Sequence, residues 1–284
     1  MHPEWDGKAP LPGDRLLVSA SSLSSVLSRP ALETWTRNEI ARKVVAEIDM
    51  VAEMAAKAPT AAEKWVSEAH WEGTRGRLSA SERGTIIHDV FEAWLHPDRS
   101  TPHAPEELWP HLEMLSKAVE ALRPRRVASE LAVCRPDGTR GWAGRLDGIY
   151  ELEGFTGGVL LDLKTAGEDT TSKGNPKRPY ADAVSLQLGA YMYATHAWPA
   201  DLLPRTISRW GSRVYLLSDI ESAQLEPAPK ASTMAVLHVT PGTCSLWTLT
   251  PDHDSLRSKV RSAVDLWWYL KGNDIPKMTK VWEA

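Results

Sequence analysis

Two apolar runs near the middle of the chain are joined by a glycine-rich stretch, and this pattern predicts a β-hairpin over residues 144–165. If the loop of the hairpin spans residues 153–156, counting back along both arms sets Asp147 opposite Asp162. Because side chains in a strand point alternately to the two faces, Asp162 and Lys164 share one face of the hairpin. The pattern therefore brings three charged groups together at its open end.

Two carboxylates in opposed positions repel each other. Directly opposed residues have Cβ atoms roughly 5 Å apart, and at that separation the repulsion is about 3 kcal/mol for an effective dielectric constant of about 20. Lys164 would offset part of this cost, and a divalent cation would offset more, since oxygen-rich sites favour hard ions such as Mg²⁺ or Mn²⁺. A solvated hairpin end with ordinary surface charges is the alternative, although the apolar neighbours of Asp162 count against it.

The first 80 residues predict a helical N-terminal lobe. Residues 31–57 place apolar side chains at mixed three- and four-residue steps, which is the spacing of an amphipathic helix. Pro59 should end that helix, and Thr60 can cap a further one. A short helix is also expected to start among the serines at 19–25 and to stop before the next proline.

The remaining residues, 81–284, predict a second domain in which helices and strands are mixed. Besides the hairpin, the patterns predict helices over residues 81–95, 112–122, 183–196 and 251–270, and strands over residues 127–134, 213–218, 234–239 and 244–249. This order predicts an α/β fold, in which a mixed central β-sheet is built on the hairpin and the strand before it. Helices that begin near Ser81 and Asp182 should flank the sheet.

Composition and charge limit the class of protein. The chain has 284 residues, of which 42% are hydrophobic and 25% charged, as is ordinary for a globular protein. Its net charge of −4 means that any nucleic-acid footprint must be a local basic patch. With only Cys134 and Cys244, neither a disulfide framework nor a four-cysteine iron–sulfur site is possible. Because no apolar run approaches a membrane span and no secretory signal pattern is present, we expect a cytoplasmic protein.

Two further pairs of side chains lie four residues apart on predicted helices, so that each pair shares a helix face. His88 and Glu92 lie beside the apolar stripe of their helix, where a histidine is more often a hydrogen-bonded core residue than a ligand. Gln187 and Tyr191 can present an amide and a phenol together, although most such pairs are ordinary helix surface.

Taken in order, four short motifs resemble the PD-(D/E)XK nuclease superfamily. They are Gly-x-x-x-His on a helix (84–88), Gly-Arg-Leu-Asp on a strand (144–147), Asp-Leu-Lys-Thr on a strand (162–165) and Gln-x-x-x-Tyr on a helix (187–191). Each motif is short, but the four together, in this order and on these elements, are specific. The resemblance is closest to the RecB-type exonuclease branch, which includes CRISPR-associated adaptation nucleases and phage exonucleases. It covers roughly residues 83–195 and implies a restriction-endonuclease-like core.

The resemblance implies a role for each motif. The implied metal ligands are His88, Asp147, Asp162 and the main-chain carbonyl of Leu163. The implied catalytic residues are Lys164, Asp162 and Asp147, with Gln187 and Tyr191 beside the lysine. Glu130 lies where some relatives carry an additional acid, and it is a secondary candidate. Asp162 stands where many members have Glu, a difference that the family tolerates.

The implied activity is metal-dependent hydrolysis of DNA phosphodiester bonds by an exonuclease that acts in recombination, repair or phage DNA processing. The implied cofactor is Mg²⁺ or Mn²⁺ without an iron–sulfur cluster, because the cluster-bearing branch needs four cysteines. The expected partner is DNA, as single strands or duplex ends, together with a possible recombination or helicase partner and no membrane. The resemblance leaves the oligomeric state open.

Positive side chains near the predicted site are candidates for phosphate contacts. They are Arg145, Lys173, Lys177 and Arg178, the last three in the polar loop that follows the hairpin. A generic polar loop is an equally good interpretation of those three residues. Three other readings of the whole chain also stay open: a structure-specific endonuclease of the same fold, a non-catalytic nucleic-acid-binding subunit, and a globular protein unrelated to phosphates.

Overall fold

The structure, a computed structural model, describes residues 10–11, 13–26, 40–41, 43–68, 80–96, 98–138, 140–171, 174–179, 181–209 and 212–271. The chain divides into two compact units, residues 28–85 and residues 1–27 together with 86–284. The sequence predicts domains over residues 1–80 and 81–284; in this division the described residues of the segment before residue 27 group with the larger unit.

The smaller unit contains α2 (Ile48–Lys57) and α3 (Pro59–Glu68). Pro59 follows the end of α2, as the sequence predicts, and also begins α3, since the first helical position needs no N–H donor. The first part of the helix expected over residues 31–57 lies outside the described residues.

The larger unit is built on a mixed sheet of ten strands, and the expected α/β class is confirmed. The strands are β1 (Arg15–Ser19), β2 (Arg125–Asp137), β3 (Arg140–Glu151), β4 (Val159–Thr165), β5 (His196–Ala197), β6 (Arg205–Arg209), β7 (Ser212–Leu217), β8 (Glu226–Pro227), β9 (Thr233–Val239) and β10 (Cys244–Leu249). The order along the main path is β10-β9-β4-β3-β1-β7-β6, while β2 pairs with β3 and β5, and β5 with β8. The sequence did not predict β1, β5, β6 or β8, which have at most five residues each.

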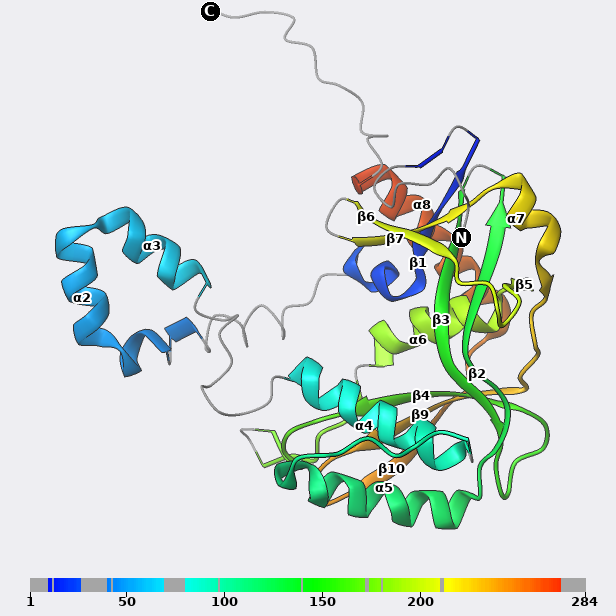
Figure 1. The fold of residues 1–284 in the computed structure, drawn as a ribbon, viewed down its shortest axis with the longest axis horizontal. Helices are drawn as coiled ribbons and strands as arrows, with labels where there is room; N and C mark the ends of the chain where they lie inside the picture. Colours follow the sequence, from blue (N-terminus) through cyan, green and yellow to red (C-terminus); the bar gives the residue numbers. More distant parts are fainter. Residues whose placement is uncertain are drawn as a thin grey trace, which may run out of the picture. The chain divides into compact units, whose positions relative to one another are not determined.

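The long strand β3 joins two branches of the sheet (Figure 1). On one side it pairs with β2 along nearly its whole length. On the other side, Gly148, Ile149 and Tyr150 pair with β4, whereas Trp142 and Ala143 pair with β1. The sheet therefore forks between residues 143 and 148, with β4, β9 and β10 on one branch and β1, β7 and β6 on the other.

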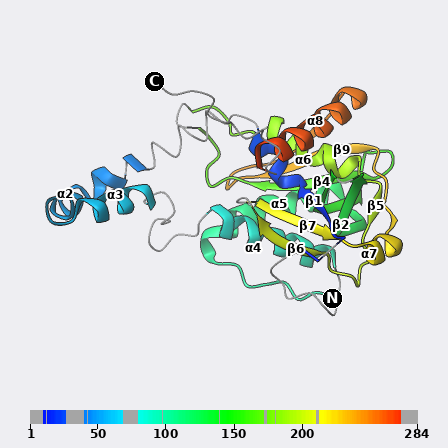
Figure 2. The same cartoon turned by 90° about the horizontal axis from the view of Figure 1, so that it is seen from above.

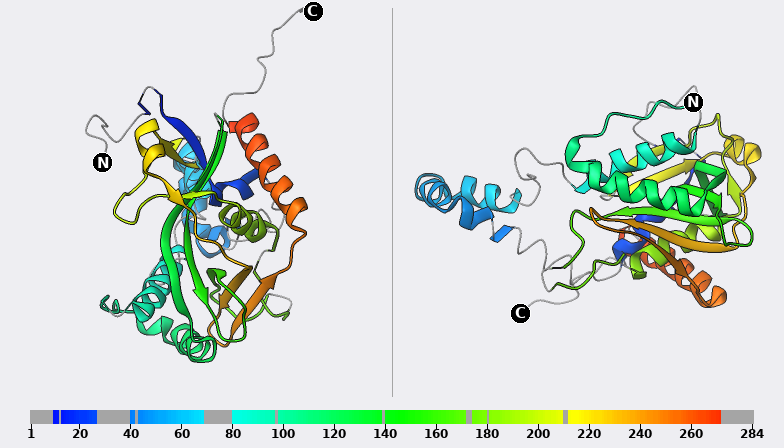
Figure 3. Two further views of the ribbon diagram at one scale, coloured as in Figure 1. Left: turned by 90° about the vertical axis from the view of Figure 1, so that its right-hand side faces the viewer. Right: turned by 90° about the horizontal axis from the view of Figure 1, so that it is seen from below.

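Helices cover both faces of this sheet (Figures 2 and 3). One face is covered by α6 (Ala181–Met192), α8 (His253–Lys271) and the 3₁₀-helix η1 (Ala20–Val26), and the other by α4 (Ala80–Leu95) and α5 (Trp109–Leu122). The short helices η2 (Glu106–Leu108) and α7 (Asp219–Gln224) complete the fold. Because β4 is covered on both faces, its sequence is an almost unbroken apolar run. Among the described residues, no helix combines the length and apolar character needed to cross a membrane.

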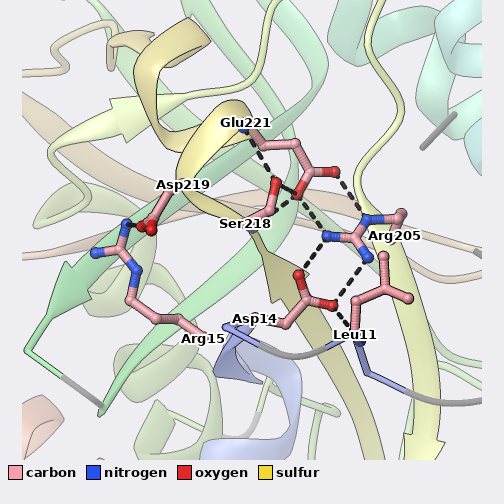
Figure 4. Close-up of polar contacts among 7 residues, drawn as sticks. All are labelled: Leu11, Asp14, Arg15, Arg205, Ser218, Asp219 and Glu221. Atoms are coloured by element: carbon pink, nitrogen blue, oxygen red, sulfur yellow. Dashed lines mark hydrogen bonds and ion pairs between the residues drawn. The ribbon is translucent and has the colours of Figure 1, made fainter. Parts of the chain in front are cut away.

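A buried ion cluster ties the segment before β1 to β6 and α7 (Figure 4). Arg205 donates hydrogen bonds of 2.9 and 2.7 Å to Asp14 and of 3.0 and 2.8 Å to Glu221. Ser218 caps α7 and donates to the same Glu221 carboxylate through its N–H and its hydroxyl. Burial acts to raise the pKa of Glu221, but the hydrogen bonds from Arg205 and Ser218 outweigh it and hold that pKa below its usual value.

Replacing Glu221 by Gln should lower the free energy of unfolding at pH 7 by about 3 kcal/mol, because Arg205 loses a buried counter-charge. The folded pKa of Glu221 lies below its unfolded value, so the ionised carboxylate stabilises the protein above the unfolded pKa, and this contribution is lost as the pH falls through the folded pKa. Urea unfolding should therefore show a smaller difference between wild type and Glu221→Gln at pH 3 than at pH 7.

Asp219→Asn is the matched control, since Asp219 is 95% exposed and pairs with Arg15 only at 3.8 Å. It should leave the unfolding free energy nearly unchanged. If the unfolding free energies of wild type and Glu221→Gln differed by the same amount at pH 3 and pH 7, the pKa of Glu221 would not be coupled to folding as described.

Candidate active site

The predicted register of the hairpin is confirmed. Gly148 pairs with Leu161, so the next positions along both strands set Asp147 opposite Asp162. These two positions lie where β3 parts from β4, at the fork of the sheet. Crevices where neighbouring strands part in this way are common ligand sites in α/β proteins.

One carboxylate takes the place of a strand at the fork. Oδ2 of Asp147 accepts a hydrogen bond of 2.9 Å from the backbone N–H of Leu163, and the same oxygen lies 3.6 Å from Nδ1 of His88. Nε2 of His88 donates to the carbonyl oxygen of Leu163 at 2.9 Å. A carboxylate from β3 and an imidazole from α4 thus satisfy both backbone polar groups of one β4 residue.

The second carboxylate faces α6 and a lysine. Asp162 is 1% exposed, and its two oxygens lie 2.9 and 2.7 Å from the ammonium group of Lys164. The amide of Gln187 donates to Oδ1 of Asp162 at 3.4 Å and to the phenol oxygen of Tyr191 at 3.3 Å. Gly144 makes this approach of α6 possible, because a Cβ there would lie 2.7 Å from the Tyr191 ring.

Glu130, the secondary candidate, reaches the same place from β2. It lies across from Asp147 in the register of β2 and β3. Its φ of +49° is in the left-handed region, which is uncommon for a residue with a side chain. Burial and the charge of Asp147 raise the pKa of Glu130, and Arg145, 3.5 Å away, offsets part of that increase.

Burial and a neighbouring carboxylate make the ionised form of Asp147 unfavourable. The pKa of Asp147 is raised, chiefly by burial and then by the charge of Asp162, although His88 and Lys164 act in the opposite direction. A raised pKa means that the ionised carboxylate costs free energy in the folded protein. Added positive charge at this place would therefore be stabilising.

The donor atoms suit a hard divalent cation. Carboxylate and carbonyl oxygens and an imidazole nitrogen are ligands that Mg²⁺ or Mn²⁺ accepts. In the part of the chain that the structure describes, however, no three His, Cys, Asp or Glu side chains stand close enough together to coordinate an ion. Asp147 accepts from the Leu163 N–H, Asp162 pairs with Lys164, and Nε2 of His88 donates to the Leu163 carbonyl. Cation binding at this site requires both carboxylates to exchange these partners.

The four residues predicted to contact phosphates differ in their surroundings. Arg145 is half exposed on β3. Lys177 pairs with Glu168 of its own loop at 3.2 Å, and the guanidinium of Arg178 lies over the ring of Trp247, 5.5 Å from its centroid. Lys173 lies outside the described residues.

Two residues on the same face of the sheet were not identified from the sequence. The row that contains Asp162 continues across β9 to Trp247 of β10, and β9 sets His238 beside Lys164. His238 is 5% exposed, and its burial, aided by the charge of Lys177, lowers its pKa. Strand alternation could have assigned each residue a face, but it does not reveal which strands are neighbours.

Comparisons with known proteins do not identify a family. No protein-family model matches the chain, and no curated protein matches it. Among solved structures, it is similar to one titled "Crystal structure of SSO0001", with a TM-score of 0.31 and 12% sequence identity over 76% of this chain and 70% of that chain. A similarity this low does not bear on function, so the class of protein has to be argued from the site.

Asp147→Asn should stabilise the metal-free protein. The amide oxygen of Asn can still accept the Leu163 N–H, while the repulsion from Asp162 disappears. Because the folded pKa of Asp147 is raised, its destabilising effect is fully present at pH 8, and its removal should increase the unfolding free energy. Thermal unfolding at pH 8 with a chelator measures this.

Asp265→Asn, an exposed aspartate of α8 that lies 3.7 Å from Arg140, is the matched control and should change little. Adding Mn²⁺ should raise the melting temperature of the wild type but not of Asp147→Asn. A chelated Asp147→Asn protein that melts below the wild type would contradict the account of repulsion.

Proposed function

We propose that this protein is a metal-dependent deoxyribonuclease that hydrolyses phosphodiester bonds as an exonuclease, in DNA recombination, repair or phage DNA processing. One observation carries the proposal: Asp147 and Asp162 lie opposite each other at the fork of the sheet, with the ammonium of Lys164 2.7 Å from Asp162. These are the acids and the lysine of the motifs that resemble the PD-(D/E)XK superfamily, and His88 joins them from α4.

Substrate can reach this group. The side chains of Asp147, His88 and Lys164 are 24%, 28% and 36% exposed, respectively. Asp147, Asp162, His88 and the carbonyl of Leu163 would hold Mg²⁺ or Mn²⁺. When bound, the ion would polarise a phosphate oxygen and lower the pKa of the attacking water.

The remaining side chains act on the phosphate or on the acids. Lys164, once released from Asp162, can donate to a phosphate oxygen and stabilise the charge that develops there in the transition state. Gln187 orients the Asp162 carboxylate and is itself held near Tyr191. Arg145, on the strand of Asp147, is placed to contact a neighbouring phosphate.

Two related functions share this core. A structure-specific endonuclease would use the same residues, because dependence on a DNA end is set outside the core. A non-catalytic DNA-binding subunit is disfavoured by the close pairing of Lys164 with Asp162. A cytoplasmic location belongs to the proposal and is supported by the two cysteines, which are both free.

Lys164→Ala and Asp162→Asn should each lower the rate of cleavage of end-labelled linear DNA in Mg²⁺ or Mn²⁺ by about 100-fold or more. Lys164→Ala removes a positive charge that would stabilise the phosphate in the transition state, and Asp162→Asn weakens the binding of the cation. A chelator should abolish cleavage. DNA binding by Lys164→Ala, measured by fluorescence anisotropy in the chelator, should remain near the wild-type level.

Lys117→Ala is the matched control for Lys164→Ala, since Lys117 is an exposed lysine of α5 paired with Glu113 at 2.7 Å. It should cleave at the wild-type rate. If covalently closed circular DNA is cleaved as fast as linear DNA, the protein is an endonuclease and not an exonuclease. If DNA is bound but not cleaved, only the non-catalytic function remains.

A further inference from the structure

The loop that follows β4 is held against the turn between β9 and β10. The carboxylate of Asp169 accepts hydrogen bonds from the hydroxyl of Thr240 and, at 2.8 Å, from the N–H of Gly242. Farther along the loop, the N–H of Lys177 donates to the carbonyl of Asp169 at 2.8 Å. These bonds close the loop on itself and hold it beside the branch of the sheet formed by β4, β9 and β10.

The loop ends in a guanidinium stacked on an indole. Arg178 lies over the ring of Trp247, 5.5 Å from the centroid, and Trp247 is 37% exposed. The sequence interpretation treated Arg178 only as a charge, and it gave Trp247 no role. An exposed aromatic ring with an arginine over it on an edge strand is a surface to which a further flat group can add.

This pair is in line with the candidate active site. Trp247 pairs with Val236 of β9, and Val236 pairs with Asp162 of β4, so the three side chains point to the same face of the sheet. Neighbouring strands lie about 4.8 Å apart, and β9 separates β10 from β4, so the backbone of Trp247 lies about 10 Å from that of Asp162. A short stretch of unpaired nucleic acid covers that distance.

We propose that Trp247 and Arg178 form a subsite for one unpaired nucleotide of a DNA strand whose phosphodiester bond lies at Asp162. This inference rests on the proposed function and specifies its substrate as a single strand or a frayed end. The base extends the stack of indole and guanidinium, and the N–H groups of Arg178 contact the adjacent phosphate. A base within a duplex is stacked on both sides and offers no face to Trp247, so the subsite selects unpaired DNA.

The test uses the full chain in a chelator, so that binding is measured without cleavage. The probe is fluorescein-labelled oligothymidylate, and the readout is anisotropy. Trp247→Thr, which keeps a residue that suits an edge strand, should weaken binding about fivefold or more, whereas Trp247→Phe should retain most of the affinity. Arg178→Ala should reduce the slope of log affinity against log salt concentration by about 0.7, the value for one phosphate contact on a single strand.

Two controls separate stacking from folding. Trp109→Ala removes a 58% exposed indole from α5, on the opposite face of the sheet, and should bind like the wild type. A strand of the same length made of abasic sites should bind wild type and Trp247→Thr equally, because it has no bases to stack. The subsite would be overturned if Trp247→Thr bound oligothymidylate as tightly as the wild type does. It would also be overturned if Trp247→Thr weakened binding to the abasic strand as much as binding to oligothymidylate.

The inference and the proposed function can fail separately. A wild-type protein that shows the Trp247 dependence but cleaves no DNA with any divalent cation retains the subsite and loses the nuclease function. If cleavage depends on Lys164 but single-strand binding does not depend on Trp247, the nuclease function is retained and the subsite is lost.

Discussion

The hydrogen bond from the Leu163 N–H to the Asp147 carboxylate is the contact on which the candidate site depends. Where β3 leaves β4 for β1, the backbone of β4 loses its strand partner on that side while it stays paired with β9 on the other. An unpaired buried N–H costs about 1–3 kcal/mol. Asp147 and His88 satisfy the N–H and the carbonyl of Leu163 instead. Two of the side chains that we propose as cation ligands are therefore the same ones that close the fork of the sheet.

The protein holds two groups of carboxylates that are at least partly buried, and their electrostatics differ. Glu221 receives hydrogen bonds from a guanidinium and from a helix cap, and its pKa is lowered. Asp147 receives one backbone hydrogen bond and faces a second carboxylate, and its pKa is raised. The first group stabilises the fold as it stands, whereas the ionised form of Asp147 is disfavoured by its surroundings, and perturbed pKa values of this kind are more frequent at functional sites.

The fork also determines which residues lie in line with Asp162. The branch formed by β4, β9 and β10 aligns Asp162 with Trp247, and the loop after β4 brings Arg178 onto that indole. The same branch therefore joins the proposed chemistry to the proposed single-strand subsite. β10 ends the sheet, and its Trp247 is 37% exposed, whereas Asp162 is buried.

Local patterns in the sequence determined the hairpin, its register and the faces of its charged residues, because a strand repeats every two residues and a glycine-rich loop sets the pairing. They also determined most helices of the larger unit. Only the tertiary structure decided that β1 and β6 are strands, that His238 and Trp247 lie beside the site, and that the first 27 residues belong to the larger unit. Those features depend on pairing between distant segments, and short apolar runs such as β1 carry no periodicity that specifies their partners.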